Sequence, residues 1–431
     1  MNGPSAVSLR VGRGSLEVVP PLGAHVEVLR KPAVEPLRDT AAAVRRALDA
    51  PVGCAALTTA AAGARTACIV VCDVTRPVPN GLLLRPIIDR LTGGGVPLDG
   101  ITILVATGLH RPNLGEELRA VIGDDWVFHH VRIENHDASD DARLVDLGPT
   151  PARGTPVLLH RGFVEADVRI VVGLVEPHFM AGYSGGRKLV APGVAAARTI
   201  QRLHASRFMA DPLAATAIVE GNPLHEEQLG ILDKVGFVFA VNTVIDEERE
   251  LVFVNAGEVV ASHAAAVAFA RGCAEVACAR PYDLILTSAG GYPLDATYYQ
   301  SVKSMVTPLE TLAPGGDLLV VSSCAEGLGS AGFRASQQAL VEGGAPAFRA
   351  RVAAQPFART DEWQTQMLLR ATGVGTVHLW AADLPAGDRV LTAVEWCDDV
   401  AAFLQRTAAR RPGLRLAIIP EGPYVVPRLA R

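Results

Sequence analysis

From Ala67 onward the chain alternates short apolar runs, rich in β-branched residues, with amphipathic stretches of helical period. The runs Ala67–Cys72 and Ile101–Ala106 are followed by helical patterns over 81–91 and 114–122. The run 168–175 has the length and composition of a further buried strand. Because parallel strands need a crossover between them, this alternation predicts a parallel sheet with helices on its faces.

A second series of the same kind fills the C-terminal part of the chain. An alanine-rich helix over 261–279 leads into it. Its predicted strands are Tyr282–Ser288, 317–323, Thr376–Ala381 and 414–419. The sequence therefore predicts an α/β protein of two domains, at 1–270 and 271–431, with mostly parallel sheets enclosing an inter-domain active-site cleft.

The remaining local patterns predict smaller elements. Two short strands, Val7–Val11 and 15–19, precede a helix over 39–48, and 131–134 is a further candidate strand. Pro86 falls inside the 81–91 pattern, where its ring removes a helical hydrogen bond. We therefore expect this helix to kink or restart there.

The composition limits the classes of partner. With 431 residues the chain has room for two domains, and a net charge of −5 argues against a nucleic-acid surface or an anionic membrane. An anionic substrate would need locally placed Arg or Lys. The N-terminus has no apolar signal core, and no run approaches the roughly 18 residues of a membrane span, which predicts a cytoplasmic protein. The seven cysteines lack C-x-x-C spacing and are expected to be reduced, packed thiols.

Polar side chains follow three of the predicted strands. Asp73 and Arg76 come after the first strand, His110 follows the second, and His178 follows the third. Ligands of open parallel sheets bind outside the carboxyl ends of the strands, so we expect these four side chains to point into one crevice. Each also has a structural explanation, since Asp73 could cap a helix and Arg76 could pair with it.

The stretch 173–204 joins a glycine-rich turn to further chemically versatile side chains. Residues 182–186 predict a flexible turn that lets the backbone approach a bulky ligand. Lys188 lies just beyond this turn, and a helical pattern over 192–208 places His204 on its apolar face. The run Gly-Gly-Arg-Lys-Leu does not match a phosphate-binding P-loop. Taken singly, His204 is more often a packed core histidine and Lys188 a solvated side chain.

The helix after the Tyr282–Ser288 strand carries Tyr299, Gln300 and Lys303. Gln300 and Lys303 are three residues apart and therefore share a helix face. We expect this face to lie toward the histidines of the first domain. The Gly-Gly pair that ends the strand lacks the rest of G-x-G-x-x-G, so an ordinary dinucleotide site has weak support.

Together these motifs resemble the nickel-pincer-dependent lactate racemases and their 2-hydroxyacid racemase and epimerase homologues. The resemblance runs over most of the chain, and several motifs in order are more specific than any one of them. The motifs are DVTRP at 73–77, TGLHRP at 107–112, EPH at 176–178, SGGRK at 184–188, His204, and GGYPLDATYYQSVK at 290–303.

The resemblance implies a cofactor, nickel pyridinium-3,5-bisthiocarboxylic acid mononucleotide (the nickel-pincer nucleotide), covalently attached at Lys188 through a thioamide link. It implies that His204 ligates the nickel. The segment that would contact the cofactor comprises Asp73, Val74, Thr75 and Arg76. The enzymes that synthesise this cofactor are the implied protein partners.

The resemblance also assigns the groups that would act on a small 2-hydroxyacid. The family's acid/base histidines fall on His110 and His178. Its substrate-binding residues fall on Arg76, Tyr299, Gln300, Lys303 and Trp363, the last in a weaker local match, DEWQ. On this interpretation the domain at 1–270 binds the cofactor and carries the catalytic residues. The Rossmann-like domain at 271–431 contributes substrate-binding residues.

This chemistry is consistent with the residue types. The C2 hydrogen of a 2-hydroxyacid is too weakly acidic for a side chain to remove as a proton. Removal as hydride yields a flat 2-oxoacid, and an electron-poor pyridinium ring could accept it. Two histidines that titrate near neutral pH could each serve as base for one enantiomer and acid for the other. Arg76 and Lys303 would hold the carboxylate, and soft donors with one imidazole suit Ni(II).

Three alternatives remain open. A nicotinamide-dependent 2-hydroxyacid oxidoreductase is disfavoured by the missing dinucleotide fingerprint. A non-catalytic cofactor-binding protein would not need both His110 and His178. A metallohydrolase using His178 and His204 would need a third ligand that the sequence does not offer. Within the leading interpretation lactate is the default substrate, and nothing in the sequence selects among lactate, malate, aromatic and sugar acids.

Overall fold

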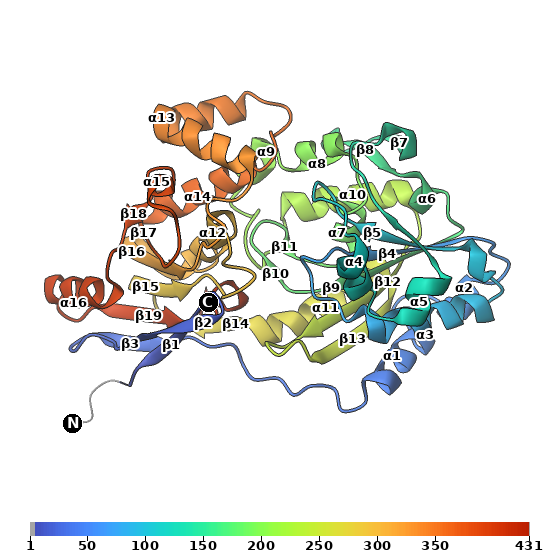
Figure 1. Ribbon diagram of the computed structural model, residues 1–431, viewed down its shortest axis with the longest axis horizontal. Helices are drawn as coiled ribbons and strands as arrows, with labels where there is room; N and C mark the ends of the chain where they lie inside the picture. Colours follow the sequence, from blue (N-terminus) through green and yellow to red (C-terminus); the bar gives the residue numbers. More distant parts are fainter. Residues whose placement is uncertain (1–4, 431) are drawn as a thin grey trace. The chain divides into compact units, whose positions relative to one another are not determined.

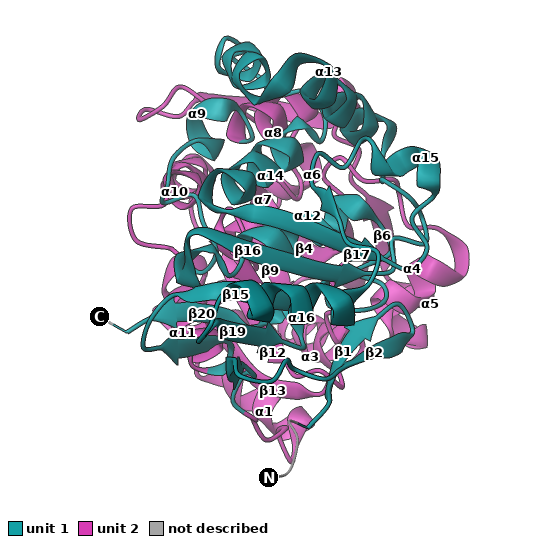
Figure 2. Cartoon of the chain, turned by 90° about the vertical axis from the view of Figure 1, so that its left-hand side faces the viewer, with its two compact units in different colours: residues 1–32, 204–217, 273–431 teal, residues 33–203, 218–272 magenta. Residues whose placement is uncertain are grey.

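The structure is a computed structural model that describes residues 5–430 (Figure 1). The chain forms two compact units, and each contains segments from distant parts of the sequence (Figure 2). Unit 1 comprises residues 1–32, 204–217 and 273–431, and unit 2 comprises residues 33–203 and 218–272. The predicted fold class, an α/β protein of two domains with mostly parallel sheets, is confirmed.

The units differ from the predicted division at 270/271 in two segments. The strand β3 (His25–Val28) joins the sheet of unit 1 by pairing with β19 (Arg415–Ile419). Residues 204–217 also belong to unit 1, because Arg370 donates hydrogen bonds to backbone carbonyl oxygens between positions 211 and 214. Both associations join segments more than a hundred residues apart, which local sequence patterns do not reveal.

Unit 2 is built on a six-stranded sheet. Its strands, in sheet order, are β13 (Leu251–Glu258), β12 (Phe239–Ile245), β9 (Val168–Leu174), β4 (Ala67–Cys72), β5 (Ile101–Ala106) and β6 (Arg132–Asn135). The edge strand β13 runs antiparallel to β12, and the other pairings are parallel. Because β4, β5 and β9 run parallel to one another, their carboxyl ends lie at the same edge of the sheet.

Helices lie on both faces of this sheet. On one face α1 (Thr40–Asp49) and α3 (Asn80–Gly93) bury their apolar sides against alternate residues of β4, β5 and β9. On the other face α6 (Arg161–Val164) and α7 (Arg187–Val190) contact the sheet. The remaining helices of the unit are α2 (Leu57–Ala60), α4 (Gly115–Ile122), α5 (Asp125–His130), α8 (Ala197–Leu203), α10 (Pro223–Val235) and α11 (Val259–Ala274).

Capping residues set several helix ends. Asp39 begins α1 by accepting a hydrogen bond from Ala42 N at 2.8 Å. Asn222 caps α10, which starts with a proline at its first position. Gly123 ends α4 with a left-handed φ of 68°. These signals explain why most helix bounds follow the sequence patterns to within a few residues.

Unit 1 is built on a second six-stranded sheet, which is parallel throughout. Its strands, in sheet order, are β18 (Glu395–Trp396), β17 (Thr376–Ala381), β16 (Leu312–Ser322), β15 (Tyr282–Ser288), β19 and β3. A hairpin of β1 (Val7–Val11) and β2 (Gly14–Val18) packs with α16 (Val400–Arg410) against one face.

The other face of the unit 1 sheet contacts α12 (Tyr298–Val306) and α14 (Glu362–Val374). The unit also contains α9 (Ser206–Met209), α13 (Ala331–Ala353), α15 (Ala386–Arg389) and a parallel pair of β14 (Glu275–Cys278) and β20 (Val426–Leu429). Within residues 5–430, no helix has both the length and the apolar character needed to cross a membrane.

Two helix predictions were wrong in detail. The helix α3 continues through Pro86 as one element, whereas we expected a kink or restart. The helical pattern over 192–208 does not form one helix, because α8 begins at Ala197 and ends at Leu203, and α9 begins at Ser206. His204 therefore lies in the connection between two short helices and not on the apolar face of a single one.

Candidate active site

The candidate residues fall into two groups, one on each unit. Unit 2 carries the residues at the strand ends and around the glycine-rich turn, namely Asp73, Val74, Thr75, Arg76, His110, His178 and Lys188. Unit 1 carries the remainder, namely His204, Tyr299, Gln300, Lys303 and Trp363. Each group is described within its own unit.

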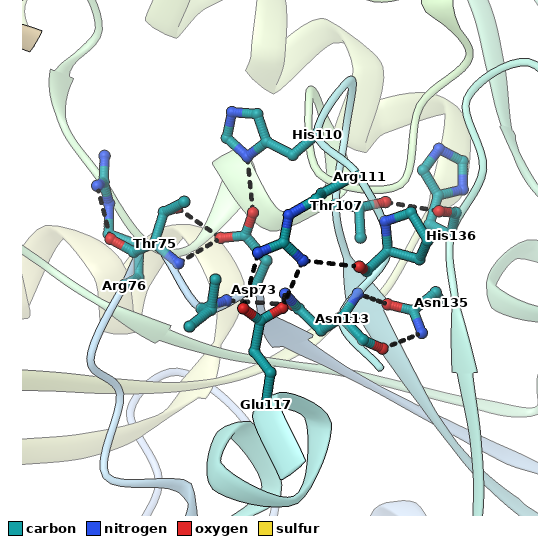
Figure 3. Close-up of polar contacts among 12 residues, drawn as sticks. Asp73, Thr75, Arg76, Thr107, His110, Arg111, Asn113, Glu117, Asn135 and His136 are labelled. Atoms are coloured by element: carbon teal, nitrogen blue, oxygen red, sulfur yellow. Dashed lines mark hydrogen bonds and ion pairs between the residues drawn. The ribbon is translucent and has the colours of Figure 1, made fainter. Parts of the chain in front are cut away.

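Asp73 and His110 form the shortest polar contact between the loops that follow β4 and β5. The Nδ1 atom of His110 lies 2.6 Å from Oδ2 of Asp73 (Figure 3). The other carboxylate oxygen of Asp73 accepts hydrogen bonds from the backbone N–H and hydroxyl of Thr75. The Asp73 side chain is buried, whereas that of His110 is 62% exposed. The carboxylate therefore fixes the inner nitrogen of a histidine whose ring reaches solvent.

The surroundings of Asp73 keep it ionised. Burial by itself would raise the pKa of this carboxyl group. The hydrogen bonds from His110 and Thr75, together with the charge that His110 carries when protonated and that of Arg76, outweigh that effect and lower the pKa below its ordinary value. An ionised Asp73 accepts the Nδ1 hydrogen of His110, which leaves the lone pair of a neutral ring on Nε2.

Asp73 does not cap the following helix, which was one of the structural explanations open to it. It closes a local turn by bonding Thr75. The Nε atom of Arg76 lies 3.2 Å from Oε1 of Glu176, in an ion pair of two partly exposed side chains. Glu176 follows β9, so this ion pair joins the loops after β4 and β9, which are neighbouring strands.

A supporting network that the sequence did not single out centres on Asn113 (Figure 3). Its side-chain oxygen accepts from Val74 N at 3.2 Å, and its amide nitrogen donates to Glu117 at 2.6 Å. Glu117 also holds Arg111 through two hydrogen bonds of 2.7 and 2.8 Å. The available signal was the asparagine that directly follows His-Arg-Pro in the same polar cluster. These contacts fix the loops that carry Asp73 and His110.

His178 lies on a two-residue strand, β10 (Pro177–His178), paired with β11 (Gly182–Tyr183). Its Nδ1 atom accepts hydrogen bonds from the backbone N–H groups of Met180 and Ala181 at 3.3 and 3.2 Å. A neutral ring that accepts at Nδ1 carries its hydrogen on Nε2. The Nε2 atom lies 3.4 Å from Nζ of Lys188. The two histidines of this unit are therefore held in opposite tautomers.

The glycine-rich turn, which we predicted to be flexible and open to a ligand, is packed against the chain's own atoms at its Cβ positions. A Cβ atom on Gly182 would lie 2.1 Å from Ile218 O, and one on Gly186 would lie 2.8 Å from the His263 ring. Gly182 and Gly186 also have φ values of 75° and 47°, which L side chains rarely adopt. Glycine is required here for backbone conformation and close packing, and the result is a rigid connection to Lys188.

In unit 1, His204 and Trp363 are in direct contact. Their ring centroids lie 4.4 Å apart at an interplanar angle of 39°. The indole N–H of Trp363 donates to the Tyr299 hydroxyl oxygen at 3.2 Å. Burial and the neighbouring charge of Asp361 raise the pKa of Tyr299, so its hydroxyl stays protonated. The structure thus brings together three residues that lie far apart in the sequence.

The helix α12 presents Gln300 and Lys303 one turn apart, as predicted. The N-cap of this helix is Thr297, whose hydroxyl accepts a hydrogen bond from Gln300 N at 3.3 Å. The side-chain oxygen of Gln300 has no hydrogen-bond partner among the described residues. An acceptor of this kind is available to a donor group of a ligand.

Comparisons with known proteins agree with this fold. Residues 11–217 match the family model described as the lactate racemase N-terminal domain, and residues 277–425 match the lactate racemase C-terminal domain. The chain is 36% identical over 290 residues to the lactate racemase of Thermoanaerobacterium thermosaccharolyticum, covering 67% of each chain. It is 35% identical over 290 residues to that of Lactiplantibacillus plantarum, covering 67% of this chain and 68% of the relative.

Solved structures give the same result. The lactate racemase apoprotein from Thermoanaerobacterium thermosaccharolyticum has a TM-score of 0.90 and 29% identity, covering 98% of this chain and 100% of that one. A Thermotoga maritima protein with a TM-score of 0.63 and 18% identity, covering 93% and 100%, shares the fold. The fold and these relatives define an isomerase of the racemase class. The chain belongs to the lactate racemase family.

Proposed function

We propose that this racemase inverts C2 of a small 2-hydroxyacid, with lactate as the first substrate to test, using His110 and His178 as opposed acid/base groups. The observation that carries the proposal is the opposite hydrogen bonding of the two rings. Asp73 accepts from Nδ1 of His110, which leaves a basic Nε2, whereas His178 accepts at Nδ1 and carries its hydrogen on Nε2. Lactate is the substrate that the names of the relatives give.

In their neutral forms the two rings present different groups at Nε2, a lone pair on His110 and a hydrogen on His178. A reaction that runs in both directions requires a base for the substrate hydroxyl at the start and an acid at the end. His110 is prepared to accept the hydroxyl proton, because its second nitrogen is already hydrogen-bonded to a carboxylate that stabilises the imidazolium. His178 would serve as the acid after taking a second proton at Nδ1, because a neutral imidazole could give up its Nε2 hydrogen only by becoming an imidazolate. After one turnover the two protonation states are exchanged, and the reverse reaction can begin from the opposite hand.

The residues fit the nickel-pincer nucleotide as cofactor. Lys188 presents an amine at the start of α7, and the rigid glycine turn before it fixes the backbone of the attachment point. No group of three or more His, Cys, Asp or Glu residues within 5–430 is placed to hold a metal ion. His204 would therefore supply a single imidazole, and the remaining soft donors would come with the nickel as part of the cofactor.

When bound, this group would supply an electron-poor ring that takes up the C2 hydrogen as hydride and returns it to either face of the flat 2-oxoacid. The chain's own residues would do the rest. His110 and His178 would move the hydroxyl proton. Lys303 and Arg76 would hold the carboxylate, with Arg76 oriented by Glu176. The Gln300 side-chain oxygen would accept a hydrogen bond from the substrate, and Trp363 would pack against the nickel ligand His204.

The alternative of a nicotinamide-dependent oxidoreductase gains no support from the unit 1 sheet. The Gly-Gly turn after β15 is covered by the N-terminal hairpin, because Tyr292 N donates to Gly12 O at 2.8 Å. A Cβ on Gly291 would lie 3.1 Å from Arg10 Cβ. This contact occupies the strand end at which a dinucleotide pyrophosphate would be expected to bind.

The experiment that tests the proposal is mass and metal analysis of protein produced with and without the cofactor-synthesis enzymes, which are the proposed partners in the cytoplasm. Peptide mass spectrometry should find an adduct on Lys188 and on none of the other lysines, Lys31, Lys234 and Lys303. The variant Lys188→Arg should lack the adduct, and His204→Ala should lose nickel. Fully active protein with an unmodified Lys188 would contradict the tether.

A further inference from the structure

Arg187 is a fully buried arginine next to Lys188, and its hydrogen bonds are to neutral groups. Its Nη2 donates to the carbonyl oxygens of Ala181 and Tyr183 at 2.7 and 3.2 Å, and its Nη1 lies 3.0 Å from Nε2 of His263. The buried Nε has no partner among the described residues. Burial lowers the pKa of Arg187 to about 9, and no carboxylate contributes to that shift.

A guanidinium in this setting is costly to maintain. Burial of a charge without a counter-ion and with an unbonded N–H disfavours the folded state, and an apolar side chain could fill the same volume. His263 does not supply the missing anion, because an imidazole side chain is neutral or cationic; burial, with the charge of Arg187, lowers its pKa well below the ordinary value and favours the neutral form. Its Nε2 is also 2.8 Å from Ser184 O, so it cannot satisfy both neighbours at once. Such a charge points to a role in the adjacent site.

The contacts of Arg187 lead directly to His178. The backbone of Ala181 makes both contacts: its carbonyl oxygen accepts from Arg187, and its N–H, in the preceding peptide group, donates to Nδ1 of His178. Arg187 also holds Tyr183 O on β11, the strand that pairs with the one carrying His178. One side chain on α7 thus fixes the hairpin that sets the tautomer of His178, while the next residue on α7 is Lys188.

The tautomer has a consequence for Lys188. The neutral His178 ring carries its hydrogen on Nε2, and that hydrogen faces Nζ of Lys188 at 3.4 Å. An ammonium group would set N–H against N–H, whereas an uncharged amine offers a lone pair to accept the hydrogen. The arrangement therefore favours the uncharged form of the lysine.

We propose that Arg187 is a positioning residue that acts through the backbone of Ala181 to hold His178 in the Nε2–H tautomer and so keeps Lys188 as an uncharged amine before any modification. The inference deepens the proposed function, because it rests on Lys188 as the attachment point. It goes beyond that function in assigning the preparation of this amine to a buried arginine.

Several charged or titratable groups lie near His178 and Lys188, on the same or on neighbouring elements. They are Arg187 on α7, His178 on the hairpin, Glu176 with Arg76 beside it, His263 on α11 and His225 on α10. Burial, followed by the charge of Arg187, lowers the pKa of both His225 and His263 and so favours their neutral forms.

The test is competitive acetylation of the unmodified chain, followed by peptide mass spectrometry as a function of pH. The sequence contains four lysines, so Lys31 and Lys234 serve as internal references. Each rate is scaled to its own high-pH plateau, which removes differences in accessibility. We expect Lys188 to reach half of its plateau at least about one pH unit below the references. Coincident profiles would overturn the proposal.

Variants then separate positioning from charge. Arg187→Met should shift the Lys188 profile upward by about one pH unit, equivalent to about tenfold less free amine near neutral pH. His178→Gln should give the same shift, and the double variant should add nothing to it, because Arg187 acts through His178. If the shifts of the Lys188 profile in the two single variants add up in the double variant, the positioning role is overturned. A wild-type Lys188 profile in Arg187→Met would overturn it as well. If Arg187→Met does not fold, Arg187→Lys replaces it in the comparison with His178→Gln and the double variant. A wild-type pH profile of Lys188 acetylation in Arg187→Lys would assign the shift to the charge of Arg187 alone.

Arg169→Met is the matched control. Arg169 is a half-buried arginine of the same unit that also donates to backbone carbonyl oxygens, including Val164 O at 2.9 Å. Its replacement should leave the Lys188 profile unchanged. Because the measurement uses neither nickel nor substrate, its outcome is independent of whether the chain racemises 2-hydroxyacids.

Discussion

The Nδ1 atom of His110 lies 2.6 Å from the Asp73 carboxylate, although the two residues are 37 positions apart in the sequence. They follow β4 and β5, which are adjacent parallel strands in register, with Cys72 opposite Ala106. The sheet therefore places the carboxylate and the imidazole in contact. The contact leaves Nε2 as the nitrogen of His110 that would act as the proposed base.

The first prediction concerns this contact. Asp73→Asn keeps the side-chain volume but removes the ionised acceptor, so the His110 ring can turn or change tautomer. We expect kcat to fall about 10²- to 10³-fold with a small change in KM. The measurement is steady-state racemisation in the cofactor-loaded enzyme.

A double-mutant cycle provides the control for that prediction. If Asp73 acts through His110, Asp73→Asn should cause no further loss in a His110→Ala background. Independent losses in the two variants would show that Asp73 acts on another part of the site. Thermal unfolding of each variant should accompany the kinetics, to separate a loss of activity from a loss of structure.

The second prediction is that His110 and His178 are required in both directions. Every turnover needs one base and one acid, so replacement of either histidine by Ala should lower racemisation from both enantiomers, each by about 10²-fold or more. Initial rates from each pure enantiomer provide the measurement. His129→Gln, at an exposed position on α5, is the control and should retain activity. A normal rate in either direction for His110→Ala would remove it from the acid/base pair.

The third prediction follows the hydrogen on C2. If that hydrogen leaves as hydride and returns, a substrate deuterated at C2 should racemise in ordinary water with its label largely retained. A two-base proton mechanism would lose the label to solvent at a rate comparable to racemisation. Proton NMR and mass spectrometry of both enantiomers measure retention. Rapid loss from the start would contradict the hydride route, and retention with release of free 2-oxoacid would favour an oxidoreductase.

The fourth prediction concerns His136, which braces the loop that carries His110. Its side chain is buried, its Nε2 donates to Ala195 O at 2.9 Å, and its backbone carbonyl accepts from the Thr107 hydroxyl. Burial lowers the pKa of His136 to about 4. Between about pH 6.5 and pH 4, His136 is therefore protonated in the unfolded chain but neutral in the folded chain. The free energy of unfolding should fall as the pH drops from about 6.5 toward 4.

The measurement is urea unfolding of the wild type and His136→Gln across this pH range. Glutamine can still donate to Ala195 O but does not titrate. The stability advantage of the wild type over the variant should therefore shrink as the pH falls, by up to about 3 kcal/mol. Asn135→Ala removes a neighbouring side chain that does not titrate, and its offset from the wild type should be independent of pH. Parallel curves for His136→Gln would contradict the prediction.

Much of the fold was determined by local sequence patterns. Runs such as Ala67–Cys72, Ile101–Ala106 and Tyr282–Ser288 became strands with these bounds, because a continuous β-branched run is stable only when both faces of the sheet bury it. The alternation of these strands with helices was sufficient to predict parallel sheets. Motif order along the chain was sufficient to indicate the family.

Other features were decided only by tertiary contacts. No local signal could place β3 beside β19, or bring His204 against Trp363, because sheet pairing and ring packing join residues that are remote in sequence. The glycines of the turn before Lys188 suggested openness to a ligand, but the atoms that surround them come from Ile218 and His263.

The tautomers of the two histidines show the same division between sequence and structure. Sequence supplied His110 and His178 as imidazoles after two predicted strands, which became β5 and β9 on either side of β4. Which nitrogen of each ring carries the hydrogen was set by a buried carboxylate in one case and by two backbone N–H groups in the other. The chemical identity of a side chain is local, but its protonation depends on the burial and hydrogen-bond partners that only the folded chain provides.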